Sequence, residues 1–227
     1  MLTARPAVRR DQSLEVQPHP WVPGSQIVGT FRYGSTEIDH LKRRDKKLGR
    51  AIDEIGMIGR EVQPDLFAAL ISGVASQQIS AKAAETVRAR MAERFSPITP
   101  RTIAAATAEE IRQCGMSMRK AAYIKGIGDA VARGDPDLAA LATLPDDAVI
   151  ERLTALEGVG VWTAEMLLIF SMQRPDVVSF GDFAIRRGMA RLYGRAVIDR
   201  AAFDRYRKRY APYGSTASLY LWEISHG

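Results

Sequence analysis

A tight glycine turn followed by a carboxylate is the part of this sequence best suited to chemistry. The stretch Leu156-Glu-Gly-Val-Gly-Val-Trp-Thr-Ala164 places Gly158 and Gly160 on either side of one apolar residue, between two segments of helical pattern. Glycine tolerates the positive φ of such a turn and lets another backbone approach closely. The second segment, about 161–172, starts directly after the turn, so its unpaired N–H groups and its helix dipole can bind a phosphate.

Asp182 follows eighteen residues after Ala164, in Ser179-Phe-Gly-Asp-Phe-Ala-Ile-Arg-Arg187. Taken alone, an Asp in this context is most simply the N-cap of the following helix. A helix N-terminus also favours the charged form of a carboxylate, so the capping role is compatible with catalysis. A phosphate site with a carboxylate close behind it indicates an enzyme that holds DNA and acts on its sugar.

The two motifs together resemble those of a known family. The turn is similar to the helix-hairpin-helix of base-excision DNA glycosylases, and Gly181-Asp-Phe-Ala-Ile185 resembles their catalytic-aspartate segment. Three further segments, in the family's order, resemble the 3-methyladenine DNA glycosylase II (AlkA-like) branch: Ser76-Gln-Gln-Ile-Ser80, Lys120-Ala-Ala-Tyr-Ile-Lys125 and Pro212-Tyr-Gly-Ser to Leu219-Tyr-Leu-Trp222. The resemblance covers roughly residues 36–226 and departs at Gly214, where relatives frequently carry arginine.

The resemblance implies an all-α fold of two helical lobes with the active cleft between them. Residues 1–35 would form an N-terminal arm, 36–64 together with 176–227 an outer lobe, and 65–175 an inner lobe that holds the hairpin at about 146–173. Thirty-five leading residues are too few for the N-terminal β domain of the larger AlkA proteins, so the chain resembles the compact form.

The implied activity is hydrolysis of the N-glycosidic bond of a damaged base, with Asp182 as the catalytic residue. Cleavage of this bond leaves positive charge on the deoxyribose, which a fixed anion stabilises. The carboxylate can also orient or deprotonate the attacking water. Relatives that also cut the DNA strand carry a Schiff-base lysine where this chain has Trp162. Tryptophan has no amine, so the resemblance implies a monofunctional glycosylase without lyase activity.

An aromatic pocket is implied for the flipped base, with Trp162 and Trp222 as its walls. Alkylated bases of the 3-methyladenine and 7-methylguanine type suit such a pocket, because cations are attracted to indole faces. Phe183 and Met166 occupy pocket positions where relatives often have tyrosines, which leaves the lesion range open. The sequence also leaves open that Trp162 is an ordinary core residue.

The resemblance assigns DNA contacts in the hairpin to Gly158, Val159, Gly160 and Thr163. Gln78 takes the position of the wedge that fills the gap left by a flipped nucleotide. Apolar side chains are the usual wedges, and a polar surface residue in a loop is the alternative interpretation of Gln78.

No cofactor is required by the implied chemistry. The single cysteine, Cys114, excludes an intramolecular disulfide and the four-cysteine iron–sulfur cluster of some relatives. A structural Na⁺ or K⁺ at the hairpin is implied by residue matching alone, with the backbone carbonyls of Thr154, Leu156 and Val159 as its ligands.

Composition agrees with a nucleic-acid partner but does not identify one. Lys and Arg number 32 against 26 Asp and Glu, a net charge of +6 that favours an anionic partner. No apolar run approaches the roughly 20 residues of a membrane span, and no secretory signal is evident. We expect a cytoplasmic protein, nucleoid-associated in a bacterium, that binds double-stranded DNA containing damaged bases as a monomer.

Helical periodicity dominates the chain. Residues 36–56 are expected to be helical, with a basic cluster (Lys42, Arg43, Arg44, Lys46 and Lys47) that is more typical of a solvated helix face than of a DNA contact. Residues 65–94 should form one or two helices, with a break at 77–80 where Ser80 can cap the second. Shorter helices are expected at 107–113, 117–133 and 146–155, and the alternation at 176–180 is too short to build a sheet.

Two alternatives to an alkylated-base glycosylase remain. One is a glycosylase for another lesion class, such as deaminated or oxidised bases. The other is a non-catalytic hairpin protein that recognises damaged DNA, which Asp182 disfavours.

Overall fold

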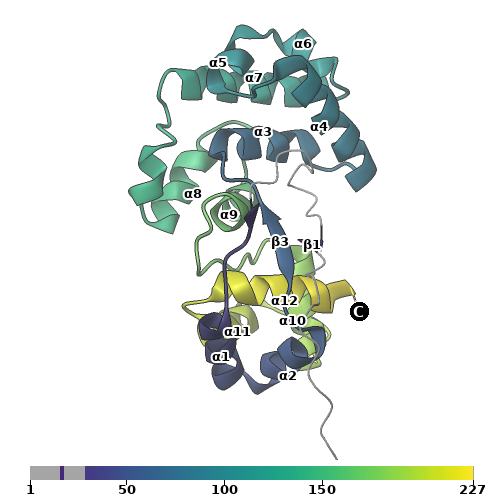
Figure 1. Ribbon diagram of the computed structural model, residues 1–227, viewed down its shortest axis with the longest axis vertical. Coiled ribbons are helices and arrows are strands. Elements are labelled where there is room, and N and C mark those ends of the chain that lie inside the picture. The colour runs from purple at the N-terminus through teal and green to yellow at the C-terminus, as the bar shows by residue number, and fades with distance from the viewer. Residues whose placement is uncertain (1–15, 18–28, 227) are drawn as a thin grey trace, which may run out of the picture.

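The computed structural model describes residues 16–17 and 29–226, and helices dominate this part of the chain (Figure 1). The predicted all-α class is confirmed. The helices are α1 (Ser35–Arg44), α2 (Lys46–Ile55), α3 (Leu66–Ser76), α4 (Ala81–Phe95), α5 (Pro100–Ala105), α6 (Ala108–Arg112), α7 (Met118–Ala132), the 3₁₀ helix η1 (Ala140–Thr143), α8 (Asp146–Thr154), α9 (Val161–Phe170), α10 (Phe183–Tyr193), α11 (Arg200–Tyr210) and α12 (Gly214–His226). No helix in this described part is long and apolar enough to cross a bilayer.

A small sheet, which the sequence pattern does not predict, includes β-strands from the N-terminal region. Strand β3 (Gly59–Val62) lies between β1 (Val16–Gln17) and β2 (Gly29–Thr30), parallel to the first and antiparallel to the second. Residues 16–17 and 29–30 of the predicted N-terminal arm (1–35) are therefore extended, while residues 1–15 and 18–28 lie outside the described residues. Two-residue strands are formed by distant backbone partners, so local sequence carries little signal for them.

The helical segment expected at 36–56 consists of two helices, and Asp45 separates them. Asp45 has extended backbone angles (φ −140°, ψ 107°), and its carboxylate accepts hydrogen bonds from the N–H groups of Lys47 and Leu48. This is an N-cap, which starts α2 immediately after α1. The apolar periodicity continues across the junction, so the pattern alone does not mark the boundary between the two helices.

The predicted break at 77–80 is confirmed. Helix α3 ends at Ser76, and Ser80 caps α4 by accepting a hydrogen bond from the N–H of Ala83. The Lys120 ammonium donates to the carbonyls of Ala75 and Gln77 and so satisfies the C-terminal end of α3. These contacts fix the loop that carries Gln78.

Figure 1 shows the helices in two groups, with α3–α7 in one, α1, α2 and α10–α12 in the other, and α8 and α9 between them. Within the second group α10 packs closely on α12: a Cβ added at Gly188 would lie 2.0 Å from the carbonyl oxygen of Leu221. Glycine at 188 therefore permits the approach that places the start of α10 beside α12. The lobe boundaries stated above stay a prediction.

Candidate active site

Asp182 sits at the N-terminus of α10, buried with 7% of its surface exposed. Its Oδ1 accepts a hydrogen bond of 2.9 Å from the N–H of Ile185, so the carboxylate is the N-cap. The cap uses only one carboxylate oxygen. The capping interpretation is thus correct as geometry, and it leaves Oδ2 available for another role.

Trp162 and Trp222 meet at that second oxygen. The indole Nε1 of Trp162, at the start of α9, donates to Asp182 Oδ2 at 2.9 Å, and that of Trp222, from α12, donates at 3.3 Å. Trp222 is 7% exposed, and its ring lies 5.5 Å from that of Phe170 at an angle of 30°. The structure therefore brings the predicted aspartate and both predicted tryptophans together. Two charge-assisted hydrogen bonds hold the carboxylate in one orientation.

The other two predicted pocket residues differ in their exposure to solvent. Met166 is 1% exposed within the hydrophobic core. Phe183 is 68% exposed, with the guanidinium of Arg187 at 5.7 Å from its ring centroid. One is packed away from solvent and the other lies on the surface, so contact of either with a flipped base stays a prediction.

The two glycines of the hairpin play different parts. Gly158 has a φ of +87°, and a Cβ there would lie 2.5 Å from Cδ2 of Tyr123, so the fold itself requires glycine. Gly160 has an ordinary φ of −92°, and a Cβ there would meet nothing within 4 Å. Gly160 is the N-cap residue of α9. Because glycine has no side chain, nothing at this position covers the N–H groups of the first helical turn.

Of the other predicted DNA contacts, Val159 and Thr163 have buried side chains, with 6% and 3% exposed. They could reach a phosphate only through their backbone. Gln78 is exposed and has a φ of +55°, a conformation that few non-glycine residues adopt. Its place at the tip of the loop after α3 is compatible with a wedge.

Gln77, the first glutamine of the motif Ser76-Gln-Gln-Ile-Ser80, connects that loop to the hairpin. Its side-chain Nε2 donates to the carbonyl of Gly158 at 3.0 Å and to the hydroxyl of Thr163 at 3.3 Å. The loop with Gln78 and the glycine turn are therefore held in a fixed relation. The signal was present in the Gln-Gln pair, but the role of the first glutamine depends on a contact 81 residues away.

Glu165 is a second carboxylate near Asp182 that sequence reasoning missed. It lies on α9 one turn after Trp162, is half-buried, and its Oε2 accepts a hydrogen bond of 2.5 Å from the hydroxyl of Ser179. Burial raises the pKa of Glu165, and the charge of Asp182 adds to this, while the Ser179 hydrogen bond and Arg200 offset part of the shift. The negative charge of Asp182 therefore makes ionisation of Glu165 less favourable.

Replacing Glu165 with Gln should stabilise the protein in a pH-dependent way. Because the pKa is raised on folding, the favourable contribution of Glu165 is complete below its unfolded pKa, near the ordinary 4.5, and is lost as pH rises through the folded pKa. Gln stays neutral throughout. The melting temperature of the variant should therefore exceed that of wild type by more at about pH 8 than at about pH 4. A difference that is constant with pH would contradict the raised pKa.

Gly214, where the resemblance expects arginine, has little room for a side chain. Its N–H donates to Asp176 Oδ1 at 3.0 Å, and a Cβ there would lie 2.6 Å from the same oxygen. Arg207 from α11 pairs with this carboxylate at 3.2 Å and donates to the Asp176 carbonyl at 2.8 Å.

Comparison with known proteins finds DNA glycosylases among the similar chains. The chain is 34% identical over 209 residues to DNA-3-methyladenine glycosylase 1 of Schizosaccharomyces pombe, which covers 88% of this chain and 90% of that protein. It is 25% identical over 171 residues to DNA-3-methyladenine glycosylase 2 of Escherichia coli, covering 70% of this chain and 57% of that one.

Solved structures show the same fold. A DNA-3-methyladenine glycosidase from Bacillus halodurans superposes with a TM-score of 0.74 at 35% identity, covering 86% of this chain and 92% of that one. The S. pombe 3-methyladenine DNA glycosylase in complex with abasic DNA superposes with a TM-score of 0.69 at 32% identity, covering 83% and 96%. Residues 71–210 match the family described as HhH-GPD superfamily base excision DNA repair protein. The chain belongs to this helix-hairpin-helix superfamily of base excision DNA repair proteins.

Proposed function

We propose that the protein is a monofunctional DNA glycosylase that removes alkylated bases by hydrolysis of the N-glycosidic bond, the first step of base excision repair. The observation that carries the proposal is the carboxylate of Asp182, which two indole N–H groups and a helix N-terminus hold in place. Relatives at 34% and 35% identity are named for 3-methyladenine excision, which supports this lesion class.

Asp182 would act on the sugar. As the bond to the base breaks, positive charge develops on the deoxyribose, and a fixed carboxylate stabilises that charge without reorganising. Trp162 and Trp222 bring aromatic rings next to the carboxylate, where an electron-poor base would be attracted to an indole face. Asp182 would also orient or deprotonate the water that attacks the sugar.

Double-stranded DNA containing a damaged base would be held by the hairpin and opened at the loop after α3. The first N–H groups of α9 suit a phosphate, and Gln78 would fill the gap left by the flipped nucleotide. The S. pombe relative was solved with abasic DNA, which supports a DNA partner. We propose that the protein acts as a monomer on chromosomal DNA in the cytoplasm.

Substitution of Gly160 by Ala should weaken DNA binding without harming the fold. The φ of −92° suits alanine and the Cβ meets nothing, so the free energy of unfolding should change by less than about 1 kcal/mol. The added methyl group would stand in front of the N–H groups that contact phosphate. Lesion and undamaged duplexes should both lose affinity, because phosphate contacts carry no sequence information.

Gly158→Ala is the matched comparison, since it adds the same methyl group two residues earlier. There the positive φ and the contact with Tyr123 should destabilise the fold itself, by at least about 1–2 kcal/mol. Fluorescence anisotropy and thermal melting separate the two effects. Wild-type affinity of Gly160→Ala for both duplexes would show that the hairpin does not contact DNA.

The reaction should stop at an abasic site. Trp162 stands where bifunctional relatives carry a lysine, and it cannot form a Schiff base. A panel of oligonucleotides, each with one defined lesion, should therefore show strand breaks only after alkali or an abasic endonuclease is added. Covalent trapping with borohydride, at a yield comparable to that of a bifunctional glycosylase, would refute this end point. The same panel ranks alkylated against deaminated and oxidised bases.

We also propose a Na⁺ or K⁺ at the hairpin, for which the donor set is suitable. The carbonyls of Thr154 and Val159 accept no backbone hydrogen bond in the part of the chain that the structure describes, and the carbonyl of Leu156 accepts one from Val159. Bound there, the ion would tie the end of α8 to the turn. A thallium-soaked crystal without an anomalous peak among these carbonyls would contradict the site.

A further inference from the structure

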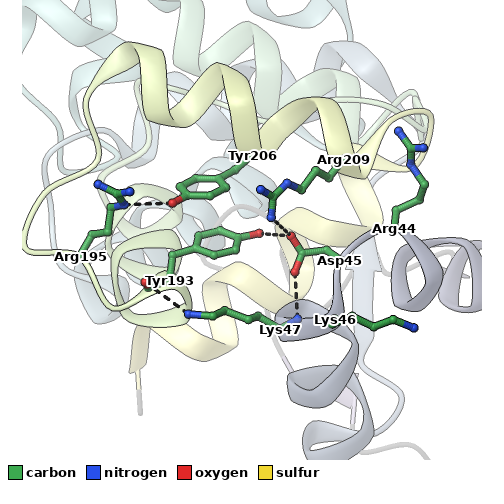
Figure 2. Close-up of a pocket in the computed structure, with 8 residues that line it drawn as sticks. All are labelled: Arg44, Asp45, Lys46, Lys47, Tyr193, Arg195, Tyr206 and Arg209. Atoms are coloured by element: carbon green, nitrogen blue, oxygen red, sulfur yellow. Dashed lines mark hydrogen bonds and ion pairs between the residues drawn. The ribbon is translucent and has the colours of Figure 1, made fainter.

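A basic pocket lies far from the catalytic cluster, where α1, α2, α10 and α11 meet. It has a volume of about 440 Å³ and is lined by Arg44, Asp45, Lys46, Lys47, Tyr193, Arg195, Tyr206 and Arg209 (Figure 2). Asp182 and Tyr193 stand at opposite ends of α10, about 16 Å apart at the rise of an α-helix. The pocket contains three cations of the basic cluster noted in the sequence, which the proposed glycosylase function does not use.

Asp45 carries the only carboxylate that lines the pocket, and both of its oxygens accept hydrogen bonds. Asp45 is 3% exposed; its Oδ1 accepts from the N–H groups of Lys47 and Leu48 at 3.0 Å, and its Oδ2 accepts from the Tyr193 hydroxyl at 2.7 Å and from Arg209 at 3.0 Å. Burial pushes the pKa of Asp45 up, but these hydrogen bonds outweigh burial and the pKa is lowered. Asp45 thus balances the charge of Arg209 and no other.

Four cations remain without a counter-charge: Arg44, Lys46, Lys47 and Arg195 form no ion pair within the described residues. Arg195 donates through Nε to the Tyr206 hydroxyl at 3.0 Å, which leaves its terminal nitrogens without a hydrogen-bond partner in this part of the chain. Lys47 Nζ lies 3.5 Å from the Tyr193 carbonyl. Figure 2 shows the Lys47 side chain reaching the Tyr193 carbonyl and that of Arg195 reaching the Tyr206 hydroxyl, while Lys46 extends away from both.

The cations of the pocket lie beside a group of packed tyrosine side chains. The rings of Tyr193 and Tyr206 are stacked with centroids 3.6 Å apart at 8°, and the Tyr193 hydroxyl pairs with that of Tyr210 at 2.8 Å. The guanidinium of Arg209 lies 5.2 Å from the Tyr206 ring centroid. Three separate elements supply the cations of the pocket: α2 carries Lys47, the loop after α10 carries Arg195, and α11 carries Arg209. The tertiary fold therefore brings these cations into one pocket. Like charges gathered this way repel one another, and a bound anion would relieve the repulsion.

We propose that this pocket binds phosphate groups, as an anion site separate from the hairpin. Planar guanidinium groups match the oxygens of phosphate in pairs, and a lysine ammonium adds a compact charge. The excess of positive charge suits a ligand with several negative charges. Two sources share this chemistry: the backbone of DNA outside the lesion site, and a free polyphosphate.

The test removes two converging cations in a Lys47→Gln/Arg195→Gln double variant of the full chain. The control is Arg50→Gln/Lys208→Gln, which removes the same charge from exposed positions on α2 and α11 that do not line the pocket. One arm measures binding of an undamaged duplex over a range of salt concentrations. The other measures binding of inorganic tripolyphosphate by calorimetry. Neither arm involves base release, so failure of the glycosylase proposal would not affect the result.

The proposal predicts that the pocket variant, and not the control, binds more weakly in at least one arm. With DNA as the source, the slope of log affinity against log salt becomes shallower by about 0.9 for each phosphate that the variant no longer neutralises. With a free polyphosphate as the source, tripolyphosphate affinity falls at least about tenfold while the duplex arm is unchanged.

If the double variant melts early, Arg44→Gln/Lys46→Gln replaces it, because these side chains make no hydrogen bond or ion pair among residues 29–226. Equal behaviour of pocket and control variants in both arms overturns the proposal.

Discussion

Asp182→Asn should reduce the single-turnover rate of base excision by at least about a hundred- to a thousand-fold, equivalent to about 2.7–4 kcal/mol of electrostatic stabilisation. Cationic lesions leave readily once flipped, so residual release of 3-methyladenine is expected. Neutral lesions need more help in departing and should suffer more. Rapid-quench assays with enzyme in excess over a lesion duplex measure both.

The structure adds a cost that the sequence could not predict. Asp182 Oδ1 accepts from Ile185 and Oδ2 accepts from two indole N–H groups, so the amide of Asn must point its NH₂ at one set of donors. One unsatisfied interaction of this kind costs about 1–3 kcal/mol, and the variant should melt earlier than wild type. Asp182→Ser is the matched control, because serine keeps the cap but does not supply a carboxylate. Excision by both folded variants within about threefold of wild type would leave Asp182 as a helix cap only.

Trp222→Ala should cause the largest loss of stability among the variants considered, about 3–5 kcal/mol. The side chain is 7% exposed, packs on Phe170 and donates to Asp182, so its removal creates a cavity and takes one donor from the carboxylate. Urea unfolding at constant pH measures the change. A loss below about 1 kcal/mol would mean that the pocket collapses around the missing ring.

Trp222→Phe separates packing from orientation. Phenylalanine keeps most of the apolar contact with Phe170 but has no N–H for Asp182 Oδ2. We expect this variant to be more stable than Trp222→Ala and to excise bases more slowly than wild type, because the carboxylate is held by Trp162 alone. Trp162→Phe should mirror it from the other side. Wild-type rates in both variants would show that the indole N–H groups do not orient Asp182.

The sequence predicted the parts of the site that depend on local chemistry. Asp182 as an N-cap, Ser80 as the cap after the break at 77–80, and the positive φ of Gly158 all follow from residue type and neighbours. The pairing of Asp182 with Trp162 and Trp222 was expected only because both tryptophans match the family, since nothing local brings residues 20 and 40 positions apart together.

The features that were missed depend on distant contacts. Asp45 caps α2 through the nearby N–H groups of Lys47 and Leu48, but its burial depends on Tyr193 and Arg209, 148 and 164 residues away. Glu165 approaches Asp182 because the segment after α9 folds back and places Ser179 on its carboxylate. In both cases the residue type suggested an ordinary surface charge, and burial by tertiary structure changed its role.

The most direct test of the account is chromatographic detection of free base released from a duplex that carries a single 3-methyladenine or 7-methylguanine. Wild-type protein in excess should release the free base and leave an intact strand with an abasic site, while Asp182→Asn should release it at least about a hundred-fold more slowly. Tight binding of the lesion duplex by wild type with no release of base would contradict the account, since it would identify a protein that recognises damage and does not excise it.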